Sequence, residues 1–445
     1  MKKATILILL VNCLLALDTV SAKTFYTSDS FSADVNIEAA GGYFTGSEDY
    51  SSNNRENITW GESYFKFGLA GQYKFSPDGL EIYGAASAMH SGAYGDGDLA
   101  GFTNGSESRT DLEDGYLGIK YTLSNGMRVD FSMGAQQFQV GDGFLIYNDA
   151  LNLGKGSGVD VNRGGAYWLA ARKAFRKTMI LKLDTASPYR MDGFYLGTEN
   201  PGNGDLEIAG LNVEYRDDEI GTLGFTYFKG LKVDKNVLGG SLQNRQGLDT
   251  YSIRGQGNAG FKNLFLSAEY AYQTNDGDGL ADVSAHAWYA EIGYTFAKFP
   301  LSPKLTYRYS FFTGNDPNTG ENEAFDPLFY GFSRGFGTWY QGEIAGNYTS
   351  PFNTNAGVHH AGLALRLRED INLNLLYFQF VTDEPAANIS DDFGEELNFI
   401  LEWQTNDYLF ISPAYGVFLP GDGGKASLNS VNTSHYFQLF FILRY

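Results

Sequence analysis

The chain has 445 residues and carries 52 acidic against 32 basic groups, a formal net charge of −20 that argues against nucleic acid as a partner. Its 30 tyrosines, 34 phenylalanines and 55 glycines exclude an acidic disordered chain, which would have few aromatic residues, and favour a sheet with many tight turns. A single cysteine excludes a disulfide framework.

The first 22 residues have the pattern of a secretory signal peptide. Two lysines precede an apolar run over residues 4–17, which is too short to span a bilayer, and Ser21 and Ala22 are small residues at the expected cleavage site. Residues 1–22 are therefore predicted to be removed. The mature chain, residues 23–445, is predicted to be one domain, because no linker or shift in composition marks a boundary.

Short turn signals alternate with long polar loops along the mature chain. The short turns lie at residues 76–79, 124–126, 187–190, 217–221, 260–263, 299–303, 369–372 and 405–407. The long loops lie near residues 46–58, 95–109, 139–175, 230–247, 275–285, 315–356, 383–394 and 420–432, with a shorter one at 200–204. Eight short and nine long connections join 18 strands, with 16 as the alternative count. This pattern predicts an all-β transmembrane antiparallel β-barrel with short periplasmic turns and long extracellular loops.

Several predicted strands alternate polar and apolar residues. Over residues 361–368, leucines alternate with Arg366 and Arg368, and arginine is costly against lipid, so both arginines should face the lumen. The basic pore lining predicted by this rule is Lys66, Lys120, Arg128, Lys182, Arg254, Lys304, Arg308, Arg366 and Arg368. The acidic pore lining is Asp34, Glu38, Asp130, Glu214, Glu269, Glu291, Glu396 and Glu402. Basic and acidic residues on different parts of the pore wall would orient polar solutes in an aqueous channel. Ordinary cross-strand ion pairing is the alternative explanation of the same pattern.

The loop over residues 139–175 is the candidate constriction, because its length allows it to fold inward and it combines charges of both signs. The residues singled out in this loop are Asp142, Asp149, Asp160, Arg163 and Arg172. An extracellular cap that never enters the lumen is the alternative interpretation.

The last strand has one wholly apolar face. Its residues are Phe437, Leu439, Phe441, Leu443 and Tyr445, and in an outer-membrane barrel they would face lipid and end in an interfacial aromatic ring. The pattern resembles the C-terminal strand that barrel-assembly machinery recognises. We expect this strand to close the barrel by pairing with the first strand near residues 33–39.

Other motifs do not support catalysis. Gly255, Gly257 and Gly260 have the spacing of a dinucleotide-binding motif, but a turn and a strand are predicted after them instead of the helix that the motif needs. His90 and the pair His359-His360 lack the neighbours of a hydrolase triad. No catalytic residue, cofactor or metal site is predicted.

Short glycine-rich motifs in the chain from about residue 130 onward are similar to those of a known family. They lie at residues 136–143, 172–175, 325–329, 393–396 and 416–421. These stretches resemble the alginate-export-like outer-membrane proteins. The resemblance implies an 18-stranded barrel and, for the type member, export of an anionic polysaccharide through an arginine-lined pore. The chain departs from the family at Ala135, where a Gly-Arg-Gln motif would place arginine.

These observations favour an outer-membrane porin, not an enzyme, that lets small hydrophilic solutes diffuse passively. The alternatives are a selective exporter of an anionic polysaccharide and an adhesin or receptor without transport. The expected partners are outer-membrane lipid and lipopolysaccharide, the barrel-assembly machinery and the small hydrophilic solutes.

Overall fold

The structure is a computed structural model that describes residues 23–51, 55–76, 79–157, 161–234, 242–275, 282–349, 351–428 and 430–445. The predicted signal peptide and Asp160 lie outside the described residues.

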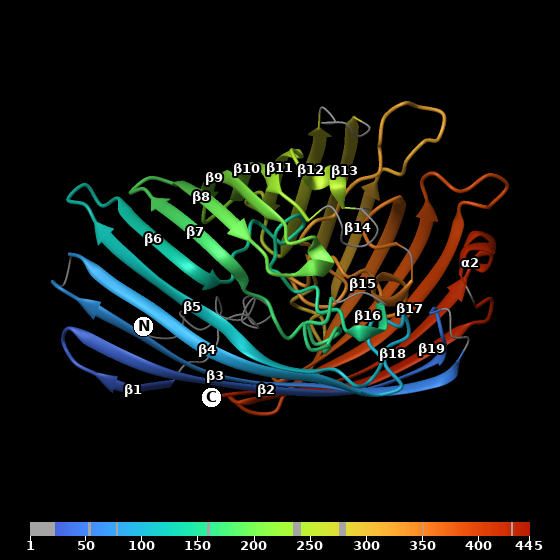
Figure 1. Ribbon diagram of the computed structural model, residues 1–445, viewed down its shortest axis with the longest axis horizontal. Helices are drawn as coiled ribbons and strands as arrows, with labels where there is room; N and C mark the ends of the chain where they lie inside the picture. Colours follow the sequence, from blue (N-terminus) through green and yellow to red (C-terminus); the bar gives the residue numbers. More distant parts are fainter. Residues whose placement is uncertain are drawn as a thin grey trace.

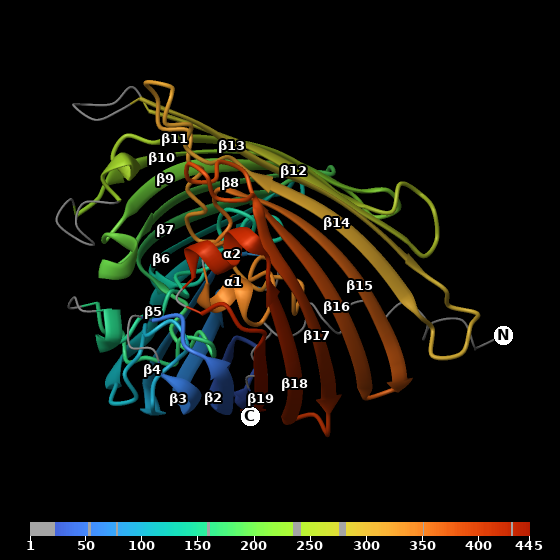
Figure 2. The same ribbon diagram turned by 90° about the vertical axis from the view of Figure 1, so that its right-hand side faces the viewer.

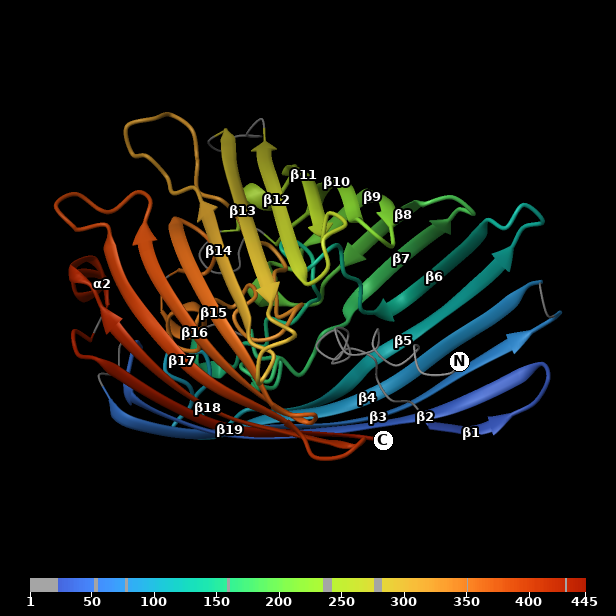
Figure 3. The ribbon, with the colours of Figure 1, turned by 180° about the vertical axis from the view of Figure 1, so that it is seen from behind.

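Nineteen strands form one antiparallel sheet, and eighteen of them close into a barrel (Figures 1 and 3). Consecutive strands pair from β2 to β19, and β19 pairs with β2, which confirms the predicted strand number and excludes the alternative of 16. The strands are β1 (Lys23–Thr27), β2 (Phe31–Glu48), β3 (Glu56–Lys74), β4 (Glu81–Gly95), β5 (Ser108–Thr122), β6 (Arg128–Gln136), β7 (Phe175–Asp184), β8 (Tyr189–Gly197), β9 (Glu207–Asp217), β10 (Gly221–Lys232), β11 (Asp249–Gly257), β12 (Leu264–Asn275), β13 (Val283–Thr295), β14 (Lys304–Phe312), β15 (Ala356–Arg368), β16 (Ile371–Thr382), β17 (Asp392–Gln404), β18 (Leu409–Pro420) and β19 (Ser434–Arg444).

Helical segments are short. They are α1 (Ala345–Tyr348), α2 (Asp422–Ser427) and the 3-10 turns Lys155–Ser157, Pro201–Asn203 and Gln243–Arg245. Among the described residues, no helix has the length and apolar character needed to cross a membrane.

The outer surface of the barrel carries large apolar side chains at every second position. On β10, Leu223 and Phe225 are exposed, whereas Gly224 and Thr226 are buried on the inner face. The five apolar residues singled out on the last strand, from Phe437 to Tyr445, are 37–46 % exposed. Exposed apolar side chains at a spacing of two suit a barrel whose outer face contacts lipid.

The barrel closes where β19 meets β2. Arg444 lies opposite Glu38, and Tyr436 lies opposite Gly46. The seam therefore runs along residues 38–46 of β2, further along the strand than the expected residues 33–39. Residues 32–35 instead pair with β1, which extends the line of β19 along the same edge of β2.

Two long loops fill much of the barrel interior (Figure 2). They are the β6–β7 loop, residues 137–174, and the β14–β15 loop, residues 313–355, which contains α1. Phe44, Trp60 and Phe378 point inward near the long-loop ends of their strands, are at most 1 % exposed, and pack in one cluster with residues of both loops. The expectation of a polar inner face therefore fails at these ends, because loops and not water cover the wall there.

Candidate functional site

Inward-facing glutamates hold the β6–β7 loop against the wall. Glu62 of β3 accepts hydrogen bonds from the backbone N–H groups of Trp168 and Leu169 at 3.2 and 2.9 Å. Glu113 of β5 accepts from the next pair along the loop, Lys173 and Ala174, at 2.7 and 2.9 Å. Each carboxylate thus satisfies two consecutive donors that would otherwise be buried without partners.

The β14–β15 loop is held in the same way. Glu396 of β17 accepts hydrogen bonds from the backbone N–H groups of Ile344 and Ala345 at 2.9 and 2.7 Å. The two loops also meet each other, because the indole N–H of Trp168 donates to Glu343 Oε2 at 2.9 Å.

A short parallel bridge joins the two loops between residues 145–147 and Phe329. The Phe329 N–H donates to the Leu145 carbonyl at 3.0 Å, and the Tyr147 N–H donates to the Phe329 carbonyl at 2.8 Å. The two loops therefore form one connected structure across the lumen.

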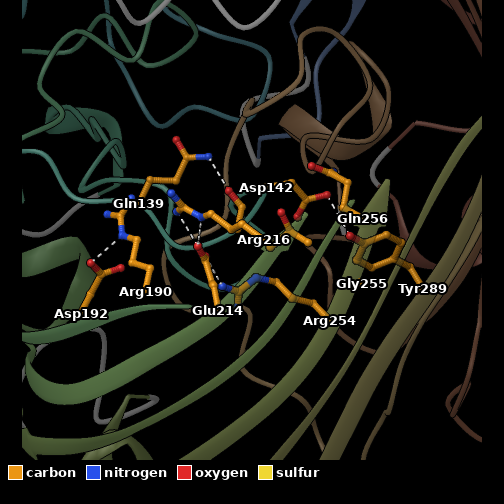
Figure 4. A pocket seen from close by; sticks show the side chains of 12 residues that line it. Gln139, Asp142, Arg190, Asp192, Glu214, Arg216, Arg254, Gly255, Gln256 and Tyr289 are labelled. Carbon is orange, nitrogen blue, oxygen red and sulfur yellow. Dashed lines mark hydrogen bonds and ion pairs between the residues drawn. The ribbon is translucent and has the colours of Figure 1, made fainter. Parts of the chain in front are cut away.

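A charged cavity of about 310 Å³ lies between the β6–β7 loop and the wall formed by β8 to β13 (Figure 4). Its lining contains three arginines and three carboxylates. The lining residues are Gln139, Gly141, Asp142, Arg190, Asp192, Glu214, Arg216, Thr222, Arg254, Gly255, Gln256 and Tyr289. A second cavity, of about 630 Å³, shares Gln139 with the first and contains Lys66, Asp114, Lys120, Asp130 and Lys182.

Ion pairs order the charges in the first cavity. Glu214 receives hydrogen bonds from Arg254 Nη2 at 2.6 Å and from Arg216 Nε at 2.7 Å. Arg190 Nε donates to Asp192 Oδ1 at 2.9 Å. The turn at Gly141 comes so close to Arg254 that a Cβ at this position would lie 2.7 Å from the Arg254 side chain. Each arginine in this cavity is therefore paired with a carboxylate.

Arg334 of the β14–β15 loop bonds both to Asp142, which lines the cavity, and to Glu291 on the barrel strand β13. It donates to both carboxylate oxygens of Glu291, at 3.0 and 2.6 Å, and to Asp142 Oδ2 at 3.2 Å. Tyr289 donates to the same oxygen of Asp142 at 2.9 Å. Burial alone would lower the pKa of Arg334, but the facing carboxylates of Glu291 and Asp142 raise it, so this side chain stays charged.

The structure places the predicted pore-lining residues in three settings. Those in the two charged cavities are Lys66, Lys120, Lys182, Arg254, Asp130, Glu214 and the loop residue Asp142. Those buried in the wall or under a loop are Arg308, Glu38, Glu269, Glu291, Glu396 and Glu402. Those that are exposed or half-buried and line neither cavity are Asp34, Arg128, Lys304, Arg366 and Arg368.

Three predicted basic residues differ from the others in their depth or in their cover by a loop. Arg308 is 1 % exposed, because the β14–β15 loop covers it and accepts its hydrogen bonds through the carbonyls of residues 337 and 338. Arg128 and Arg368 lie beside short turns, where they are exposed and pair with Asp184 and Asp370. The alternation of polar and apolar residues along a strand indicates on which face of the sheet a side chain lies. It does not indicate how far the side chain lies from the end of the barrel or whether a loop covers it.

The other charged residues singled out in the β6–β7 loop support the loop itself. Arg163 Nη1 lies 3.3 Å from Asp149 Oδ2, and Asn200 donates to the other oxygen of Asp149 at 2.9 Å. Arg172 Nε donates to the Arg163 carbonyl at 2.9 Å. Burial raises the pKa of Asp149 to about 6. Asp142 is thus the residue of this set that lines the first cavity.

The sequence interpretation missed Arg190, Arg216 and Arg334. Arg190 alternates with Tyr189 and Met191 on its strand, so the rule used for the other strands could have found it. Arg216 similarly follows Tyr215 just before a short turn. No periodic pattern marks Arg334, because it lies in an irregular loop.

Comparisons with known proteins agree with this architecture. The family model described as alginate export matches residues 18–436. No curated protein matches the chain. Solved structures with a similar fold include a BenF-like porin from Pseudomonas fluorescens, at 11% identity over 93% of this chain and 98% of that one, with a TM-score of 0.62. OccK2 (OpdF) of Pseudomonas aeruginosa, solved in complex with glucuronate, has 11% identity over 93% and 97% and a TM-score of 0.58.

OccK8 (OprE) of Pseudomonas aeruginosa is also similar, at 13% identity over 93% of this chain and 98% of that one, with a TM-score of 0.57. At these identities the likeness to solved structures concerns the fold, whereas the family model covers almost the whole chain. The chain belongs to the alginate export family and is a bacterial outer-membrane β-barrel with the fold of the porins.

Proposed function

We propose that the protein is a passive diffusion pore for small hydrophilic solutes, narrowed by its two inward loops. The observation that carries this proposal is the cavity of about 310 Å³ between the β6–β7 loop and the barrel wall, which contains charges of both signs. Fixed charges of opposite sign on facing surfaces orient polar or zwitterionic solutes as they pass.

The ion pairs favour small polar solutes over a long polyanion. Arg216 and Arg254 both lie within 2.7 Å of Glu214, and Arg334 is shared between Glu291 and Asp142. A polyanion would need cations that are free to leave their carboxylates, and separating a partly buried pair is costly. Export of an anionic polysaccharide remains the second candidate, because the description of the family points to it.

The remaining alternatives predict different behaviour. An adhesin needs no polar path through the lumen, and an enzyme needs a reactive constellation. The three candidate histidines make structural contacts. His90 is hydrogen-bonded to Thr110, His359 is hydrogen-bonded to Tyr307, and the ring of His360 stacks on Phe378. A non-enzymatic role, contacts with lipopolysaccharide and recognition of the last strand by the assembly machinery are parts of the same proposal.

Reconstitution in planar bilayers tests the pore. We expect stepwise ohmic conductance, and Arg216→Ala should shift the reversal potential towards cation selectivity because Glu214 then keeps a single arginine partner, Arg254. Arg128→Ala is the matched control, since it removes the same charge from an exposed pair beside a turn. A membrane-inserted barrel without conductance would refute the pore. Current block by oligomers of an anionic polysaccharide, but not by small solutes, would favour the exporter.

A further inference from the structure

A third cavity is lined by the two loops together with other connections at the long-loop end of the barrel. Its volume is about 280 Å³, and five long connections contribute to its lining. The lining residues are Phe102, Asn148, Ala150, Leu151, Leu153, Tyr167, Gly202, Asn203, Arg245, Pro327, Leu328, Phe329, Tyr330, Tyr340 and Phe352. Six of these residues have aromatic rings, so we call this cavity the aromatic pocket.

Several of these rings lie in close pairs. Tyr330 and Tyr340 have ring centroids 5.1 Å apart, and Phe332 stacks on Tyr340 from outside the lining at 4.5 Å. Phe102 lies 4.9 Å from Tyr167 by the same measure. Aromatic faces of this kind pack against flat ligands that expose C–H groups.

Among the described residues that line the aromatic pocket, the one charged side chain is already paired. Arg245 is the charged residue of its lining, and its guanidinium donates to both carboxylate oxygens of Asp326 at 2.7 and 2.8 Å. A third hydrogen bond runs from Arg245 to the Asn203 carbonyl at 3.1 Å. An anionic ligand would therefore compete with Asp326, and a cationic ligand would find no carboxylate among the lining residues.

Polar groups that are neutral remain available beside the rings. Burial raises the pKa of Tyr340 to about 12, so its phenol stays protonated in neutral solution and can donate a hydrogen bond. Asn148 also belongs to the lining, and its carboxamide oxygen is buried without a hydrogen-bond partner among the described residues. This combination suits a ligand with hydroxyl groups at its edge and an apolar face.

The pocket lies next to the bridge that joins the loops. Phe329 belongs both to the bridge and to the pocket lining. Tyr147 lines the charged cavity of about 630 Å³, whereas its neighbour Asn148 lines the aromatic pocket. The bridge therefore contributes neighbouring residues to the aromatic pocket and to the charged cavity.

We propose that the aromatic pocket binds one neutral saccharide ring from the extracellular side, before the solute enters the lumen. The volume lies near the lower end of small-molecule sites, roughly 300 Å³, and so suits a single ring. The site rests on the proposed pore for its biological role, but binding itself does not require conduction.

Saturation-transfer NMR on the purified barrel, with methyl glucoside as the probe, tests the site. We expect binding, and we expect Tyr330→Ala with Tyr340→Ala to weaken it about tenfold, which corresponds to about 1.4 kcal/mol, because two ring contacts are lost. Replacing both tyrosines by phenylalanine should keep most of the affinity. Leu151→Trp should abolish binding with both tyrosines in place, because it fills the pocket.

The matched control is Tyr227→Ala with Tyr251→Ala, a tyrosine pair 5.0 Å apart that does not line the pocket and should leave binding unchanged. Preferential binding of glucuronate or of tetramethylammonium would overturn the assignment to a neutral sugar, and so would no binding at all. Conductance without sugar binding would refute this site alone. Sugar binding by a barrel that does not conduct would refute the pore and leave the site.

Discussion

At the scale of single residues, glutamates that face inward explain how the loops stay in the lumen. Glu62, Glu113 and Glu396 come from three different strands, and each accepts hydrogen bonds from two consecutive loop N–H groups. A buried carboxylate is costly unless donors surround it, and a buried loop is costly unless its N–H groups are bonded. Each contact therefore satisfies both partners and fixes the position of the loop.

Glu343 makes loop packing sensitive to pH. Burial raises its pKa to about 8, and the carboxylate of Glu396 acts in the same direction. Because the folded pKa lies above the ordinary value of 4.5, the stabilising protonated form is fully present below that value and is lost as the pH rises through about 8. Thermal unfolding of the wild type should therefore occur at a lower temperature at pH 9 than at pH 6.

Glu343→Gln should reduce this difference in unfolding temperature. Glu321→Gln is the control, because Glu321 is an exposed residue of the same loop. The same pH dependence in wild type and in Glu343→Gln would show that another group is responsible.

At the scale of elements, the strands and the loops have different roles. The strands present apolar residues outward and charged residues inward, and the two inward loops decide which of those charges can contact a solute. Arg254 lines a cavity, whereas Arg308 lies on a nearby strand and is covered by the β14–β15 loop. The bridge between Ile146 and Phe329 joins the two loops, so that they narrow the path through the barrel together.

Deleting residues 326–346 should raise single-channel conductance severalfold, because it removes Arg334 and the bridge from the lumen. Deleting residues 317–321 is the control, since these residues form an exposed part of the same loop. Single-channel recording compares the two deletions. Equal conductance in both would show that the β14–β15 loop does not narrow the path.

At the scale of the whole molecule, closure of the barrel depends on the last strand. Arg444 donates to Glu38 at 2.7 Å on the inner side of the seam, and backbone hydrogen bonds join Tyr445 to Ile37. The outer side of the seam carries the apolar residues of β19, including Phe441, which is 46 % exposed.

Phe441→Lys should lower the free energy of unfolding in lipid vesicles by up to about 2–4 kcal/mol, the cost of a cationic side chain at the bilayer midplane. Phe441→Leu keeps the apolar face and should have little effect. Urea titration of the folded barrel in vesicles measures both. An unchanged stability of the lysine variant would indicate that this face does not contact hydrocarbon.

The sequence by itself determined the strand number, the antiparallel closure and the outward face of the barrel. These features follow from a repeat of two residues and from the alternation of short and long connections, which are local properties of the chain. The same pattern placed Glu214 and Arg254 on the inner face, where the structure shows them paired.

Only the tertiary structure decided which inward residues are accessible. Arg308 and Arg254 have the same local pattern, yet one is covered by a loop and the other lines a cavity. Arg334 and the aromatic pocket are built from irregular loops that approach one another across the barrel. Their positions depend on contacts between residues far apart in the chain, such as Asp142 with Arg334, and no local period encodes such contacts.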